Sequence, residues 1–244
     1  MRNVTFAAAT TGLLCSVSGA NVLWDNGGMV THPGAGAGGF DVSMASDGAN
    51  AGANVLQQTT GDHYRIADDF TVSGTWLIDS ITVHAYMPGS NSPGWTDGEL
   101  RIWDGSPADT GSAVVATFSN PTIAQTNIYR VFHGTANLSS THRLINAVTF
   151  DLANLELTSG GYWIDWQMVG GGGVAAWASP VMEANPGDPN NPITPVGNAI
   201  QLSPGGWRPY LDSNETPFIV RGVPAPGAAA TLAFAGLVGL RRRR

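Results

Sequence analysis

Short runs of alternating apolar and polar residues recur along this chain, and no long stretch shows the 3.6-residue apolar period of an amphipathic helix. In the clearest run, Ile81, Val83, Ala85 and Met87 alternate with more polar residues before a turn at Pro88. Turn-forming residues separate the runs, which is typical of an all-β sandwich or barrel. We therefore predict an all-β fold, a single β-sandwich of the jelly-roll type. Further runs cover residues 100–103, 114–118, 128–132, 148–152, 162–168 and 218–221.

The N-terminus has the three parts of a secretory signal peptide. Residues 1–3 include one arginine, residues 4–14 are moderately apolar, and Ser18 and Ala20 are small residues at the −3 and −1 positions of a cleavage site. We expect residues 1–20 to be a signal peptide removed after Ala20. The alternative is an ordinary buried N-terminal helix.

The C-terminus also has three parts, in a fixed order. A Pro/Gly break is followed by an apolar run from Ala228 to Leu240 and then by an arginine cluster. The apolar run is short for a membrane span, which needs about 20 residues, and the arginines would hold their end in the cytoplasm. We expect a short apolar helix here, and the alternative is a frayed terminus. The residues that form this expected sorting signal are Val223, Pro224, Pro226, Gly227, Arg241, Arg242, Arg243 and Arg244.

This tail resembles the PEP-CTERM signal of bacterial exosortase systems, from which it differs at Ala225, where the family name implies Glu. The resemblance implies an exported protein of the cell envelope or extracellular space. It also implies contact with export machinery and an exosortase-like processing enzyme, and transient insertion of the tail into the inner membrane. The expected organisation is then a signal peptide (1–20), a β-sandwich domain (21–222) and a sorting segment (223–244).

The expected domain between the two signals is strongly acidic. It holds six arginines, no lysine and all eighteen acidic residues, a formal charge of −12, and the only cysteine lies outside it. Nucleic-acid binding needs a basic footprint, so we predict that this class of partner is excluded. The absence of cysteine removes disulfides and thiol chemistry from the expected domain.

A second resemblance covers most of residues 62–221. Segments 67–72, 76–83, 100–105 and 161–167 are similar in order to those of a group of secreted bacterial β-sandwich proteins that carry C-terminal sorting tags. It implies a jelly-roll-like accessory domain and no particular activity.

Aromatic and acidic residues on two of the expected strands suggest a carbohydrate-binding face. Sugar sites often combine an aromatic ring, which stacks on the pyranose, with carboxylates and amides that bind its hydroxyls. In a strand over 162–167, residues 163, 165 and 167 would share one face, and residues 162, 164 and 166 would share the other, which we expect to face the core. The alternatives are tryptophans buried in the core and an Asp165 paired with an arginine such as Arg101. The candidate ligand-binding residues are Trp95, Asp97, Glu99, Trp163, Asp165 and Gln167.

Clustered aspartates suggest a calcium site. Calcium takes several oxygen ligands from carboxylates and loop carbonyls. Asp62, Asp68 and Asp69 fall within eight residues, and Asp188 lies in a loop rich in Pro and Asn. The alternatives are a solvated strand edge, an Asp–Arg65 pair and a plain surface loop.

Catalytic motifs have little support in this sequence. It contains no His-x-His, His-Glu-x-x-His or Gly-x-Ser-x-Gly pattern. We expect a non-catalytic cell-envelope or extracellular-matrix protein, and polysaccharide is its candidate ligand. The alternatives are a secreted polysaccharide-active glycosidase or lyase, and a calcium-dependent structural surface protein.

Overall fold

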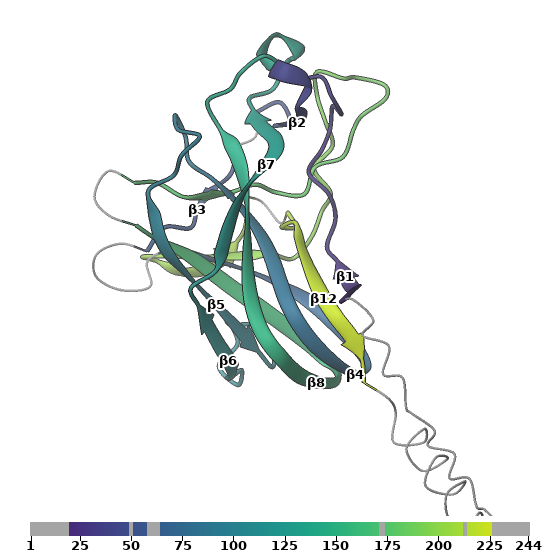
Figure 1. The fold of residues 1–244 in the computed structure, drawn as a ribbon, viewed down its shortest axis with the longest axis vertical. Helices are drawn as coiled ribbons and strands as arrows, with labels where there is room; N and C mark the ends of the chain where they lie inside the picture. The colour runs from purple at the N-terminus through teal and green to yellow at the C-terminus, as the bar shows by residue number, and fades with distance from the viewer. Residues whose placement is uncertain (1–19, 49–50, 58–63, 171–173, 212–213, 226–244) are drawn as a thin grey trace, which may run out of the picture.

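The computed structural model describes residues 20–48, 51–57, 64–170, 174–211 and 214–225. These residues form strands and loops with two short 3₁₀ helices, η1 (Ala37–Gly39) and η2 (Thr135–Asn137) (Figure 1). The predicted all-β fold class is confirmed. The strands are β1 (Asn21–Asp25), β2 (Asp41–Met44), β3 (Ala53–Asn54), β4 (Arg65–Tyr86), β5 (Trp95–Trp103), β6 (Val114–Ser119), β7 (Thr122–Val131), β8 (Leu144–Gly170), β9 (Trp177–Ala178), β10 (Ile200–Ser203), β11 (Gly206–Pro209) and β12 (Phe218–Pro224).

Two long strands organise the sheet. β4 and β8 pair antiparallel along nearly their whole length, from Ile66 opposite Trp166 to Tyr86 opposite Ile145. The pairing shifts register between Val72 and Thr75, where Gly74 has a φ of 77°. Such irregularities increase twist and bend a ribbon, so this ribbon curves back on itself (Figure 1).

The curved ribbon contributes to both layers of the sandwich. In one half, β5 pairs with residues 163–170 of β8, and β10 pairs with residues 65–67 of β4. In the other half, β7 pairs with the start of β8, and β12 pairs with residues 76–83 of β4. One continuous hydrogen-bonded sheet therefore supplies both faces of the core.

The core lies between these halves. One cluster of buried side chains contains Phe70 and Trp166 from the first half and Ile81 and Phe150 from the second. The alternation predicted for 81–87 is present over 81–85, where Ile81, Val83 and Ala85 are fully buried, and it ends there, because Tyr86 is also buried and Met87 is half-buried. Burial of this apolar set against both halves is the main stabilising term of the fold.

The sequence predicts separate strands at 148–152 and 162–168, but the structure joins them in β8. The intervening residues carry little alternation because they lie at the bend of the ribbon. Ala153 and Asn154 have positive φ values of 50° and 64°, and the Asp151 carboxylate accepts a hydrogen bond from the Ala153 amide at 2.8 Å. A local irregularity therefore interrupts the sequence pattern without ending the strand.

The first and last described strands lie side by side. β1 pairs antiparallel with β12, with Asn21 opposite Gly222. β12 continues to Pro224, and the Ala225 amide donates to the Thr75 carbonyl at 2.8 Å, so the first residues of the expected sorting segment belong to the sheet. Residues 1–19 and 226–244, which hold most of both expected signals, lie outside the described residues. No helix within the described ranges is long and apolar enough to cross a membrane.

Gly222 of β12 lies close against the backbone of β4. A Cβ at this position would lie 2.1 Å from the Leu77 carbonyl oxygen and 2.9 Å from the Ile78 Cα. We expect Gly222→Ala to destabilise the fold by about 1–3 kcal/mol through this backbone clash, measured by urea unfolding. The matched control is Gly161→Ala on β8, whose Cβ would meet no atom within 4 Å. Equal stability of the two variants would contradict the prediction.

Candidate ligand-binding site

Most of the residues predicted to bind carbohydrate lie together on neighbouring strands. β5 and β8 place Glu99 opposite Gln167 and Arg101 opposite Asp165. Trp103 likewise faces Trp163. This face of β5 and β8 lies opposite the face that carries Leu100 and Ile164 into the core, so the predicted shared face of 163, 165 and 167 is present.

Trp95 does not belong to this face. Its side chain is buried in the core, and its indole nitrogen donates to the Ala175 carbonyl at 2.8 Å. A register shift separates it from Asp97. The ring is therefore packed against protein on both sides, and the proposal that it stacks on sugar is corrected.

The charged groups of the β5–β8 face bind each other. The guanidinium of Arg65, from β4, is fully buried and contacts the carboxylate of Asp165 through two of its nitrogens. Its Nη1 also lies 3.0 Å from Glu99 Oε1, while Arg101 Nη2 lies 2.8 Å from the same oxygen. The indole of Trp103 donates to the other Asp165 oxygen at 2.6 Å. We name Arg65, Glu99, Arg101, Trp103 and Asp165 the ion-pair network.

This network leaves little for a ligand to bind. Burial raises the pKa of the Asp165 carboxyl, and the charges of Arg65 and Arg101 oppose that rise. Gln167 is buried beside it, and its Oε1 has no hydrogen-bond partner among the described residues. The Asp97 carboxylate accepts hydrogen bonds from the Gly98 and Asn120 amides, each at 2.7 Å. The alternative given for this strand in the sequence analysis therefore describes this face. Asp165 is buried and paired with an arginine, and that arginine is Arg65.

The described aspartates predicted to bind calcium, which are Asp68, Asp69 and Asp188, do not form a metal site together. Asp68 is fully buried, Asp69 is half-buried on the opposite face of β4, and Asp188 is exposed with its carboxylate bound to the Asn190 amide at 3.1 Å. Within the described ranges, no three His, Cys, Asp or Glu side chains are placed to hold a metal ion. Asp62 lies outside those ranges.

Asp68 instead joins three distant segments. Its Oδ2 accepts hydrogen bonds from the Thr216 amide at 2.7 Å, the Thr216 hydroxyl at 2.9 Å and the Asn26 amide nitrogen at 2.9 Å. The same Asn26 nitrogen lies 3.3 Å from Glu215 Oε2. Burial, followed by the neighbouring Glu215 carboxylate, raises the pKa of Asp68 to about 8. We name Asn26, Asp68, Glu215 and Thr216 the carboxyl cluster.

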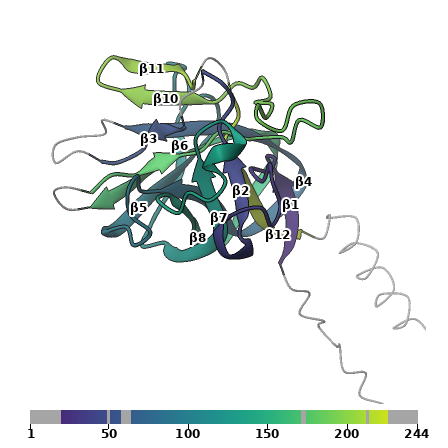
Figure 2. The same cartoon turned by 90° about the horizontal axis from the view of Figure 1, so that it is seen from above.

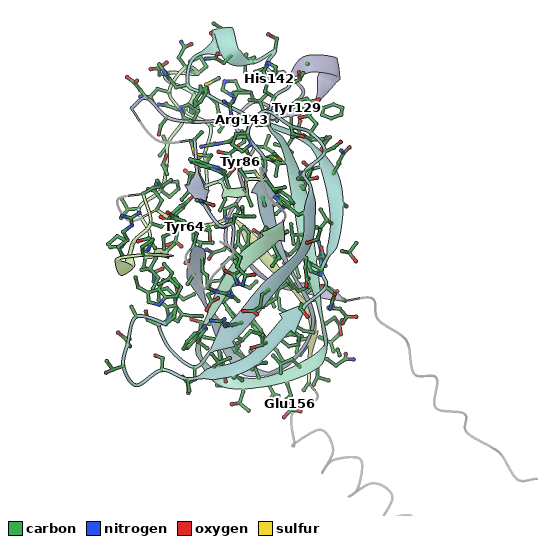
Figure 3. The ribbon with its side chains drawn as sticks, turned by 90° about the vertical axis from the view of Figure 1, so that its left-hand side faces the viewer. Tyr64, Tyr86, Tyr129, His142, Arg143 and Glu156 are labelled. Atoms are coloured by element: carbon green, nitrogen blue, oxygen red, sulfur yellow. The ribbon has the colours of Figure 1, made fainter. Side chains whose placement is uncertain are left out.

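A cavity of about 230 Å³ lies elsewhere, beside β3, β9 and the β10–β11 hairpin. Figure 2 shows this hairpin projecting from the sandwich next to β3. Figure 3 shows Tyr64 on that flank, apart from Tyr129 and His142 at one end and Glu156 at the other. The cavity is lined by Gly52, Ala53, Asn54, Tyr64, Trp177, Gln201, Arg208 and Leu211.

Backbone pairing positions the aromatic wall of the cavity. β9 pairs with both β3 and β4, which places Trp177 opposite Asn54 on one side and opposite Tyr86 on the other. Gly52 permits this close approach, because a Cβ there would lie 2.2 Å from the Ala178 carbonyl oxygen. The Tyr210 hydroxyl donates a hydrogen bond to the Ala178 carbonyl oxygen at 3.0 Å, which also holds β9 in position.

Two amides of the lining are held in place and retain hydrogen-bonding capacity. Gln201 Nε2 donates to the Asn54 carbonyl at 2.8 Å, and Asn54 Oδ1 accepts from the Leu56 amide at 2.9 Å. In this assignment Gln201 keeps its side-chain oxygen as an acceptor and Asn54 keeps its side-chain nitrogen as a donor. A ligand hydroxyl, which both donates and accepts, matches this pair.

A buried cation holds the chain segment that precedes β3. Arg130 is completely buried on β7, where its Nε donates to the Ala51 carbonyl at 2.7 Å and its Nη1 to the Ser43 hydroxyl at 2.9 Å. Burial lowers the pKa of Arg130, and nearby Tyr86 opposes that change. These bonds fix Ala51 and so the adjoining Gly52 wall of the cavity.

Sequence patterns did not indicate the cavity. Tyr64, Trp177 and Arg208 lie at the ends of strands or on very short strands, where no alternation marks a shared face. They also come from segments more than thirty residues apart, brought together only by the sheet.

Comparison with protein-family models gives no match, and comparison with curated proteins gives none either. A function for this chain is therefore inferred from its own residues.

Proposed function

We propose that this chain is an exported, non-catalytic protein of the cell envelope or extracellular matrix that binds polysaccharide in the cavity beside the β10–β11 hairpin. The observation that carries the proposal is the lining of that cavity. Tyr64 and Trp177 supply half-buried aromatic rings, and Asn54 and Gln201 supply amides held by the backbone. Rings that stack on pyranose faces and amides that bind hydroxyls are the groups that saccharide recognition requires.

The positions of the chain ends support the export part of the proposal. Asn21 and Gly222 are paired, so the described residues that adjoin the two expected targeting segments lie side by side at one edge of the sheet. Figure 2 shows that edge, at β1 and β12, on the side of the molecule away from the β10–β11 hairpin. A protein attached or processed at its C-terminal tail would present the cavity away from the membrane.

The lining favours binding over hydrolysis. Most glycosidases need two carboxyl groups on either side of the scissile bond. The described lining residues include aromatic, amide, aliphatic and guanidinium groups but no carboxylate. The carboxylates of Glu99 and Asp165 lie in the ion-pair network, where arginines already contact them.

Removing either ring of the cavity is expected to weaken saccharide binding roughly tenfold, which corresponds to about 1.4 kcal/mol. The measurement is calorimetric titration of the protein against a panel of oligosaccharides, with and without calcium, using Tyr64→Ala and Trp177→Ala. Tyr129→Ala is the matched control, because Tyr129 stacks on Phe40 with ring centroids 5.2 Å apart and does not line the cavity.

Three outcomes separate the candidate functions. Saturable binding that is about tenfold weaker in the cavity variants and unchanged in Tyr129→Ala supports the proposal. Binding that requires calcium favours the calcium-dependent alternative. Release of shortened saccharide products on prolonged incubation favours the polysaccharide-active enzyme.

A further inference from the structure

Arg208 is the one charged side chain among the described residues that line the cavity. Of the six arginines within the described residues, Arg208 alone is exposed. Of the other five, Arg65 and Arg101 bind carboxylates, Arg130 is buried, Arg143 lies 4.1 Å above the Phe132 ring, and Arg221 is half-buried on β12. The described lining holds no acidic side chain, so its formal charge is positive on a domain that is strongly acidic.

The hairpin fixes where this charge lies. Arg208 on β11 is directly opposite Gln201 on β10. Side chains directly opposite each other in an antiparallel pair project from the same face and lie about 5 Å apart at Cβ. The guanidinium therefore shares a wall of the cavity with the Gln201 amide, which is itself held by Asn54.

We propose that the cavity binds an acidic saccharide, and that Arg208 pairs with a carboxylate carried on the sugar ring. This inference rests on the proposed saccharide-binding function and names its ligand class. A planar guanidinium forms two parallel hydrogen bonds with a carboxylate, which fixes orientation as well as charge. The aromatic rings and amides would then contact the ring face and hydroxyls, while Arg208 selects uronate over neutral sugars.

The test compares oligogalacturonate with its fully methyl-esterified form of the same length. The two share the same sugar rings and linkages, and differ in carrying a charged carboxylate or a neutral methyl ester. Wild-type protein is expected to bind the free acid about tenfold more tightly than the ester, a difference of the size expected for one charge-assisted pair. Arg208→Gln is expected to lose that preference and to bind the free acid and the ester with similar affinity. Arg208→Lys, which keeps the charge without the planar fork, is expected to fall between the two.

The outcomes distinguish this inference from the proposed function. Equal affinity for acid and ester in the wild type, or a preference that survives Arg208→Gln, would overturn the uronate assignment while saccharide binding stands. Preferential binding of dextran sulfate over oligogalacturonate would overturn the carboxylate assignment. If the protein binds neither the acid nor the ester nor any saccharide of the panel, the proposed function itself is overturned. Urea unfolding of Arg208→Gln beside the wild type serves as the folding control, and equal unfolding midpoints are expected because Arg208 is exposed.

Discussion

Asp165→Asn is expected to lower the free energy of unfolding by about 3 kcal/mol. Removing one member of a buried ion pair leaves the other charge without its partner, which typically costs about 3–5 kcal/mol. Arg65 is fully buried, and its contacts with Asp165 join β4 to β8 across one hundred residues of sequence. Glu99 stays within 3.0 Å of Arg65 in this variant, so the lower end of that range is expected.

Two further variants separate charge from packing. Glu99→Gln removes the partly exposed carboxylate of the same network, and a pair of this kind contributes about 1 kcal/mol or less. The double variant Arg65→Met/Asp165→Leu replaces the pair with apolar side chains, and buried pairs replaced in this way often recover most of the lost stability. Urea unfolding at pH 7 measures all three. A double variant less stable than Asp165→Asn would show that packing, rather than the unpaired arginine, sets the loss.

The same network marks the limit of the sequence prediction. Alternation in 162–167 correctly indicated that Asp165 lies on the face opposite Ile164, because side-chain direction follows from strand periodicity alone. Which arginine reaches Asp165 depends on the pairing of β4 with β8, whose register is set by tertiary structure. The sequence analysis gave Arg101 as an example of the arginine that pairs with Asp165, whereas the ion pair is made by Arg65 of β4.

The cavity shows the complementary limit. Its lining comes from short strands and strand ends, where packing against several elements decides which way each side chain faces. Composition gives the net charge of the domain, which is acidic, but it does not show where in space an exposed arginine such as Arg208 lies. The fold class was predictable because alternation is local, and the candidate site was not because it is assembled by long-range pairing.

The carboxyl cluster carries the second prediction, a loss of stability as pH rises. Asp68 has a pKa of about 8 in the folded protein, against about 3.9 in an unfolded chain. The folded state therefore holds the proton more tightly, so the stabilisation is complete below pH of about 4 and is lost as pH rises toward 8. The limiting slope is about 1.4 kcal/mol for each pH unit.

Asp68→Asn removes this titration while keeping most of the hydrogen bonds. An asparagine oxygen can still accept from Thr216 and Asn26, while its amide nitrogen replaces the oxygen that accepts from the Asp69 amide at 2.9 Å, so that one hydrogen bond is lost. The free energy of unfolding of the variant is expected to be flat between pH 6.5 and 8, where the wild type declines. Asp69→Asn, half-buried on the opposite face of β4, is the control and is expected to follow the wild type.

The choice of pH window separates Asp68 from His84, which also lies in this part of the sheet. Burial lowers the pKa of His84, whose ring contacts the Pro217 carbonyl at 3.3 Å. A lowered histidine pKa destabilises the fold only as pH falls below the unfolded value of about 6.5. Above that value His84 is neutral in both states, so a slope between pH 6.5 and 8 that vanishes in Asp68→Asn reports the carboxyl cluster. A slope that persists in Asp68→Asn would assign the titration to another group.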